Sequence, residues 1–278
     1  MDRKNALQQL VDKAGKGELA FPTGVDVSLR LVQQLDSPDC HVDQAVQLVK
    51  ASPLLAARIV AVANSAAYCR SGQNVSELRG AIARIGLRTT RTLTVALATR
   101  QMAGTPGTPA QRVAAEQLWA HTANVAALAH VIARRVTRCD PETALFAGII
   151  HEIGGFFLIS QASSFPELLA GEPADWSEQA EPAVGRAILA RLSIPATVSE
   201  AVEAVWDGLH SLPPVTLGDT LVLANELAAV SSPLNQYATT SSPDSAPLVD
   251  AVIGEATLSS ILEESSQEVE SLVAALRF

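Results

Sequence analysis

The sequence predicts an all-α fold built from many helices of modest length. Apolar residues recur at spacings of three and four along most of the chain, which is the period of a helix that buries one face. Alternating β-branched runs joined by Asn-Gly or Asp-Gly turns are absent, so almost no sheet is expected. Hydrophobic residues make up 48% of the 278 residues, enough for one large core or two small ones.

The expected helices are mostly Ala-rich segments, and two of them begin at recognisable caps. Ser52 followed by Pro53, and Asp140 followed by Pro141, each place an N-cap residue before a proline that suits the first helical position. The last expected helix is amphipathic. The full set covers residues 42–63, 76–102, 110–138, 141–160, 178–192, 196–208, 215–230 and, after a loop, 255–276.

Two stretches that cannot continue a helix predict how the chain is divided. Residues 103–109 contain two prolines and two glycines, so no helix is expected to cross them. We therefore expect a helical subdomain over 1–103 and a larger one over 104–278. Residues 231–247 are rich in Ser, Thr and Pro, and this composition predicts a mobile loop before the last helix.

Charge and composition argue against several function classes. The formal net charge of −9 opposes the phosphate backbone, so no nucleic-acid partner is expected. The first residues lack a secretory signal and no uncharged run is long enough to span a bilayer, which predicts a cytoplasmic protein without a membrane partner. The three cysteines stand far apart, against a zinc site or a disulfide framework. One local basic patch is interpreted as a solvated helix face: Arg84, Arg88, Arg91 and Arg100.

Three polar residues fall where the apolar pattern predicts burial. On the expected helix 110–138, His121 shares an apolar face with Leu118 and Val125. His151 and Glu152 interrupt the segment LFAGIIHEIGGFFL, which is apolar on all sides. Because a buried carboxylate must be paired or protonated, these two residues and His121 are expected to meet across two packed helices.

Other polar residues invite a functional and a structural interpretation. His41, His130 and His210 stand among charged or polar neighbours and are expected at the surface. Asn64 and Ser65 close an expected helix, where they either bind a ligand or cap the helix through backbone groups, and capping is favoured. No GxSxG elbow, GxxxxGK[ST] phosphate loop or Cys/His arrangement competes as a catalytic motif.

Five motifs follow one another along most of the chain. The first three are FPTGVDVSLRLVQQL, then SPLLAARIVAVANSAAY with Asn64 and Ser65, then AIARIGLRTTRTL with Gly86. The segments LWAHTANVAALA and AGIIHEIGGFFL come next. In this order they resemble the HDOD family, relatives of HD-domain metal-dependent phosphohydrolases that have generally given up catalysis. The resemblance implies a multi-helix HD-like fold with a smaller N-terminal helical subdomain and a larger HD-like one.

The resemblance also implies the remnant of a metal site. It makes His121 the first ligand and His151 the second, with Glu152 in place of an aspartate. Asn225, in LVLANELA, stands in place of the last aspartate and offers only a neutral carbonyl. We expect this set to remain as a hydrogen-bonded polar cluster without metal. If it holds an ion, the ligands are His121, His151 and Glu152.

Further positions depart from the pattern of the active enzymes. Val205 and Trp206 stand where relatives often carry a pair of histidines, and Gly155 stands where active HD enzymes often carry lysine. Two-metal hydrolysis needs two dications about 3.5–4 Å apart, held by several carboxylates and imidazoles. The resemblance therefore implies a protein with no catalytic residues and no cofactor, which is not an enzyme.

Three hypotheses for function follow. The leading one is a non-catalytic signal-transduction protein that regulates by binding other signalling proteins in a bacterial pathway, which the resemblance links to cyclic dinucleotides. The alternative from the enzyme class is a residual metal-dependent phosphohydrolase or phosphodiesterase that acts on nucleotides or cyclic dinucleotides. The third is a small-ligand-sensing module that uses a crevice near residues 103–109. The partner, its binding face and the oligomeric state remain open at this stage.

Overall fold

The fold is helical, as the sequence predicts. The computed structural model describes residues 3–22, 24–165, 168, 180–208, 211, 213–234, 252–253 and 256–277. Over these residues the only strands are β1, Val252–Ile253, and β2, Ala256–Thr257, which pair antiparallel. The all-α fold class is confirmed.

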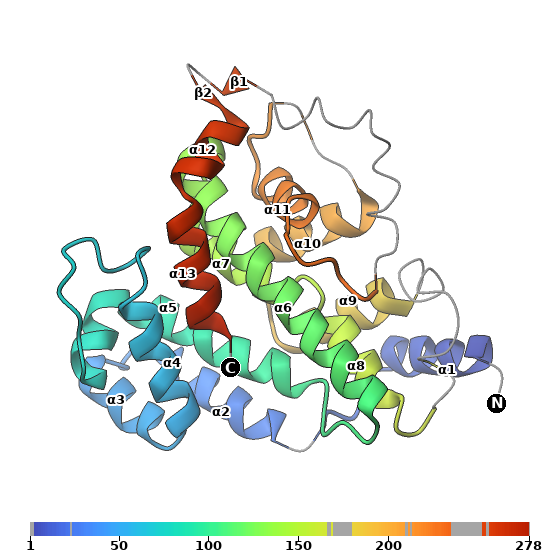
Figure 1. Ribbon diagram of the computed structural model, residues 1–278. Coiled ribbons are helices and arrows are strands. Elements are labelled where there is room, and N and C mark those ends of the chain that lie inside the picture. Colours follow the sequence, from blue (N-terminus) through green and yellow to red (C-terminus); the bar gives the residue numbers. More distant parts are fainter. Residues whose placement is uncertain are drawn as a thin grey trace.

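Helices α2 to α5 lie together at the lower left of Figure 1, whereas α1 lies apart from them at the right, beside α9 (Glu181–Arg191). Their bounds are α1 Arg3–Gly15, α2 Val25–Leu35, α3 Val42–Lys50, α4 Pro53–Ala63 and α5 Leu78–Gln101. Helices α2, α3 and α4 all pack against α5. The expected cap at Ser52 is present, because its side chain accepts a hydrogen bond from the Leu55 backbone N–H.

The central helices carry most of the residues that build the site. They are α6 Pro109–Ile132, which runs on into a π-helical turn at Ala133–Thr137, then α7 Pro141–Ile150 and α8 Ile153–Gln161. The expected cap at Asp140 is present, with its side chain bonded to the Thr143 backbone N–H. The prediction of a single helix over 141–160 is wrong, because this stretch breaks at His151 and Glu152 into α7 and α8.

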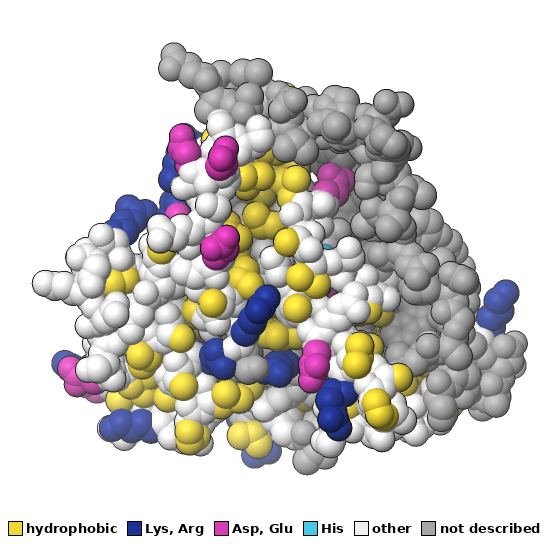
Figure 2. All heavy atoms as spheres, in the orientation of Figure 1, with side chains coloured by type: hydrophobic (Ala, Val, Ile, Leu, Met, Phe, Trp, Pro, Cys, Tyr) yellow, Lys and Arg dark blue, Asp and Glu magenta, His cyan; other side chains and the backbone are white. Residues whose placement is uncertain are grey.

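The remaining helices surround this centre. They are α9 Glu181–Arg191, α10 Ala196–Asp207, α11 Leu217–Glu226, α12 Leu258–Glu264 and α13 Ser266–Leu276. Helix α13 lies across α6 and also contacts α4 (Figure 1). Beside it, an apolar groove of about 500 Å³ lies between α13, α12, α6 and the residues that follow α11, and Figure 2 shows hydrophobic side chains on this face.

Two breaks in the helical pattern were expected, at residues 103–109 and at 231–247. No helix crosses 103–108, so α5 and α6 are separate helices there. Helix α1 packs against α9, and α5 contacts α7 and α8 as well as its own neighbours, so the division at residue 103 stays a prediction. Of the expected mobile loop at 231–247, only residues 231–234 are described, and the rest lies outside the described residues.

Close packing of α6 and α7 sets the geometry of the site. A Cβ on Gly148 would lie 2.5 Å from the Cα of Ala126, so α7 approaches α6 more closely than any larger residue permits. Among the described residues, Pro141–Gln161 is the one stretch with the length and composition of a membrane span, and 89% of its apolar window is buried inside this fold. That burial is typical of a core helix pair.

Candidate functional site

Three buried side chains from three helices meet at the centre of the molecule. His121 comes from the middle of α6, His151 ends α7, and Glu152 precedes the first residue of α8. Their exposed fractions are 2%, 0% and 5%. The break between α7 and α8 lets two consecutive residues reach the same place, which a continuous helix does not allow because neighbours point about 100° apart.

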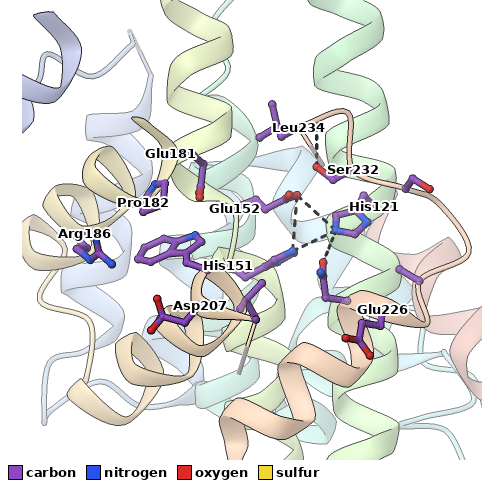
Figure 3. A pocket seen from close by; sticks show the side chains of 16 residues that line it. His121, His151, Glu152, Glu181, Pro182, Arg186, Asp207, Glu226, Ser232 and Leu234 are labelled. Atoms are coloured by element: carbon purple, nitrogen blue, oxygen red, sulfur yellow. Dashed lines mark hydrogen bonds and ion pairs between the residues drawn. The ribbon is translucent and has the colours of Figure 1, made fainter. Parts of the chain in front are cut away.

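The distances confirm the expected meeting of these residues (Figure 3). The Nε2 atoms of His121 and His151 are 3.3 Å apart. Glu152 Oε2 lies 3.6 Å from the first and 3.7 Å from the second. Asn225 of α11 joins them, with its Oδ1 3.0 Å from His121 Nε2. The structure thus brings together all four residues that the resemblance assigned to the remnant site.

The protonation of the cluster follows from its backbone contacts. His121 Nδ1 lies 2.7 Å from the Val230 carbonyl oxygen, and His151 Nδ1 lies 2.7 Å from that of Gly148. A carbonyl only accepts, so each Nδ1 carries the proton and donates it. In the neutral rings both Nε2 atoms then present lone pairs to Glu152, and the Asn225 carboxamide meets His121 Nε2 as a donor when its N–H2 and oxygen exchange places. Burial, as the largest cause, lowers the pKa of His151 to about 4, which keeps that ring neutral near pH 7.

This donor set suits one metal ion. Glu152 Oε2 is buried and has no hydrogen-bond partner, because the two Nε2 atoms that face it carry lone pairs and no proton to donate. The centre of a triangle with sides of 3.3, 3.6 and 3.7 Å lies about 2 Å from each corner, the length of a Zn–N or Zn–O bond. His121, His151 and Glu152 would hold such an ion, which would supply Lewis acidity. The expectation that the site holds no metal stays a prediction.

The cluster forms one side of a cavity of about 830 Å³. The other walls come from α9, α10, the C-terminal end of α11 and the described residues that follow it (Figure 3). The further lining residues are Glu181, Pro182, Arg186, Val205, Trp206, Asp207, Gly208, Glu226, Ala228, Ser231, Ser232 and Leu234. This cavity is therefore lined by other segments than the 103–109 linker, where the ligand-sensing hypothesis expects a crevice.

Glu181 of α9, with its neighbour Arg186, is a cavity residue that the sequence did not single out. Its side chain is 4% exposed and its Oε1 has no hydrogen-bond partner. Burial first, and then the nearby charge of Glu152, raise the pKa of Glu181 well above its usual range. The Arg186 guanidinium donates to Glu203 and lies 5.1 Å from the ring of Trp206. In the sequence, Glu181 reads as an ordinary acidic residue of a first helical turn.

Three positions where the resemblance noted a departure also line the cavity or support it. Val205 and Trp206 stand on the cavity wall in place of histidines. A Cβ on Gly155 would lie 2.1 Å from Leu234 Cδ1, so the space that a lysine would need is filled by leucine. The structure therefore replaces polar groups of the active pattern by apolar contacts at these places.

The family-signature residues lie in the N-terminal helices and make backbone contacts. Asn64 ends α4, and its carboxamide both donates to the Val75 carbonyl and accepts from the Val75 N–H, at 2.8 Å each. Ser65 Oγ donates to the Val62 carbonyl at 2.7 Å. Ser65 thus caps its own helix, whereas Asn64 holds the loop that follows. Gly86, with φ 80° and ψ 169°, forms a kink inside α5.

The remaining three histidines were all expected at the surface, and the outcome differs among them. His41 is exposed, as expected. The expectation for His130 is wrong, because its side chain is buried, with an exposed fraction of 4%. Its sequence neighbours are polar, but α13 and α7 cover this end of α6 and supply the half-buried Glu268 and Glu142 as partners. His210 lies outside the described residues.

Comparison with known proteins places this fold. A solved structure from Shewanella amazonensis, provisionally named a metal-dependent phosphohydrolase, matches with a TM-score of 0.72 at 20% identity over 99% of this chain and 100% of the other. An HDOD domain protein of unknown function from Geobacter sulfurreducens matches with a TM-score of 0.60 at 21% identity, over 99% and 98% of the chains. At these identities the likeness shows the fold alone.

A third solved structure, from Marinobacter aquaeolei, is provisionally named a signal transduction protein. It matches with a TM-score of 0.52 at 16% identity, over 99% of this chain and 66% of the other. No curated protein of known function matches the sequence. The model of the HDOD domain family matches residues 21–207, well over half of the chain. With this match, the order of its motifs and its HD-like helical fold, the chain belongs to the HDOD domain family.

Proposed function

We propose that this HDOD protein is a non-catalytic regulatory module of a bacterial signalling pathway that acts by binding other signalling proteins. The observation that carries the proposal is the composition of the buried cluster: two imidazoles, one carboxylate and one carboxamide. Hydrolysis with two metals needs more carboxylates and imidazoles than this set offers. Within the described ranges, His121, His151 and Glu152 are the one group of three ligating side chains close enough to share an ion.

In this proposal the cluster is structural. It joins α6 to the break between α7 and α8 and, through Asn225 and the Val230 carbonyl, to the end of α11. The hydrogen bonds of His121 to the Val230 carbonyl and of His151 to the Gly148 carbonyl fix the two rings and hold these helices in one arrangement. The binding of partners then depends on the surface of a rigid scaffold. The provisional name of the Marinobacter relative, a signal transduction protein, agrees with this role.

The second candidate is a phosphohydrolase that uses one metal ion. The observation that favours it is the convergence of three lone-pair atoms at 3.3 to 3.7 Å on one side of a cavity of about 830 Å³. The provisional name of the Shewanella relative points to the same chemistry. A single ion could activate a water at such a site, although a second ion would lack ligands among the described residues.

One experiment separates the two candidates. The untagged protein, purified without chelators, is analysed for metals and then assayed with Mn, Fe or Mg on a nitrophenyl phosphodiester, on nucleotides and on cyclic dinucleotides. We expect at most one ion per chain and no turnover above that of a His151→Ala control. Metal-dependent turnover that His151→Ala abolishes would overturn the proposal and establish the phosphohydrolase.

A further inference from the structure

The cavity lining is acidic, although burial raises the pKa of Glu181 and favours its neutral form while no cation is bound. Of its described lining residues, Glu152, Glu181, Asp207 and Glu226 are acidic and Arg186 alone is basic. The charge of Arg186 is already offset by Glu203, which it contacts through Nε at 2.7 Å and 2.9 Å and which does not line the cavity. Without a bound metal, such a lining repels a phosphate or another anion and attracts a cation.

Two carboxyl oxygens inside the cavity lack partners. Glu181 Oε1 and Glu152 Oε2 are buried atoms without a hydrogen-bond partner among the described residues, although the Trp206 indole and the Gly155 backbone N–H lie close enough to the Glu181 carboxyl group to lower its pKa somewhat. The two side chains are 4% and 5% exposed, and Figure 3 shows both entering the cavity from neighbouring elements. An unpaired buried oxygen costs free energy, and a ligand that brings N–H donors recovers it. These oxygens therefore point to a ligand rather than to a solvated acidic cluster.

The backbone around Glu181 is shaped to leave this carboxyl group room. A Cβ on Gly154 would lie 3.1 Å from Glu181 Oε1 and 2.6 Å from the Glu181 carbonyl oxygen. A Cβ on Gly185 would lie 2.6 Å from Cζ2 of Trp206, so the indole can lie directly on α9. The two glycines thus place a carboxyl group and an aromatic ring side by side on the cavity wall.

The aromatic ring already accepts a cation. The Arg186 guanidinium lies 5.1 Å from the centre of the Trp206 ring, within the range of a cation–π interaction. Because Trp206 also lines the cavity, a second cation that enters finds the indole beside the two carboxyl groups. The volume of about 830 Å³ is that of a small-molecule site.

We propose that the Glu181 side of this cavity is a binding site for an organic cation, a guanidinium or alkylammonium group held by Glu181 and Glu152 beside Trp206. Planar guanidinium groups match carboxylate pairs and stack on aromatic rings, so they satisfy all three side chains at once. The cation belongs either to a free small molecule or to a basic side chain of a protein. The proposal holds whether or not the protein turns over a substrate.

Calorimetric titration of the chelator-treated full-length protein tests it. The probes are agmatine as a free organic cation, N-acetyl-arginine amide as the side chain of a protein, and adenosine monophosphate as an anion. We expect at least one cation to bind and the anion not to bind. Glu181→Gln keeps the shape of the side chain but cannot release a proton to become charged beside a bound cation, and it weakens binding about tenfold. Glu200→Gln, an exposed change on α10 outside the cavity, leaves binding unchanged.

The relative affinity of the two cations tells which source fits better. A second measurement guards against a variant that does not fold: the indole N–H signal of Trp206 in the wild-type protein, assigned with Trp206→Phe, should shift when the cation is added. No binding of either cation, equal binding by Glu181→Gln, or no shift of the Trp206 signal would each overturn the proposal. Binding of adenosine monophosphate in place of the cations would do so as well.

Discussion

His151 shows how burial sets the chemistry of a single residue. Its Nδ1 donates to the Gly148 carbonyl one turn earlier, which fixes the ring and turns Nε2 toward His121 and Glu152. The ring is fully buried, so the charged form is disfavoured and the pKa of His151 falls to about 4. The cluster therefore offers lone pairs near pH 7.

This shift predicts how stability depends on pH. In the unfolded chain His151 titrates near 6.5, and in the folded chain at about 4, so the unfolded state takes up its proton first as the pH falls. The free energy of unfolding of metal-free protein should drop between about pH 6.5 and 4, by on the order of 3 kcal/mol from this residue. His151→Gln should flatten that slope in urea titrations.

The matched control is His41→Gln, because His41 is exposed. It should leave the pH dependence of the wild-type protein in place. The same slope in His151→Gln as in the wild type would show that another group causes the loss of stability in acid.

At the scale of elements, the contact between α6 and α7 decides whether the site exists. Gly148 lies directly against Ala126, where any side chain would overlap the backbone of α6. This approach brings His151, three residues further along, to 3.3 Å from His121. A small shift of α7 would separate the two rings, since packed helices move as rigid bodies.

Gly148→Ala should therefore destabilise the protein by about 1–3 kcal/mol, because the added methyl group meets backbone atoms that cannot yield. Chemical denaturation of the variant measures this loss. Gly15→Ala is the control: nothing lies within 4 Å of a Cβ on Gly15, so its effect should be small. Equal effects of the two substitutions would mean that α6 and α7 pack less closely than described.

Helix α5 corrects one interpretation of the sequence. Its basic patch is only in part a solvated face: Arg88 is exposed, whereas the other three arginines are half-buried, and each of the four contacts another element of the fold. The contacts join Arg84 to the Ala63 carbonyl, Arg88 to Asp140, Arg91 to Asp36 and Arg100 to the ring of Trp119. The charge pattern alone could not reveal partners that are distant in sequence.

At the scale of the whole molecule, a second, partly buried polar cluster joins distant segments. Glu142 of α7 accepts hydrogen bonds from Tyr68, at 2.8 Å, and from Thr89 of α5, at 2.6 Å. His130 of α6 lies between Glu142, at 3.5 Å, and Glu268 of α13, at 3.9 Å. Four elements and the loop after α4 thus meet around one carboxylate and one imidazole.

Removing one donor should weaken this junction. Tyr68→Phe leaves Glu142 with one partner fewer in a partly buried place, and we expect a loss of about 1–3 kcal/mol in the free energy of unfolding. A double-mutant cycle with Thr89→Val, followed by urea denaturation, should show that the two effects are not additive. Purely additive small effects would show that the cluster does not hold the elements together.

The sequence by itself determined the local features of this protein. Periodicity predicted helical stretches from residue 42 onward, although the stretches 42–63 and 141–160 each form two helices and α1 was not expected. The caps at Ser52 and Asp140 marked two helix starts correctly. The sequence also predicted that His121 and His151 are buried, because their sequence neighbours are apolar. These features depend on residues within one or two helical turns, so a single chain carries their full signal. The order of the motifs added the family, because it ties those local signals together.

Only the tertiary structure decided which distant residues meet. Three features depend on how helices far apart in sequence pack. They are the break between α7 and α8, the burial of His130 beneath α13, and the cavity wall formed by Glu181 and Trp206. No local window contains the partner that buries a residue or leaves its oxygen unpaired. Burial and pairing set the cost and the charge of a polar group, so the chemistry of the cavity emerges only when the whole chain is packed.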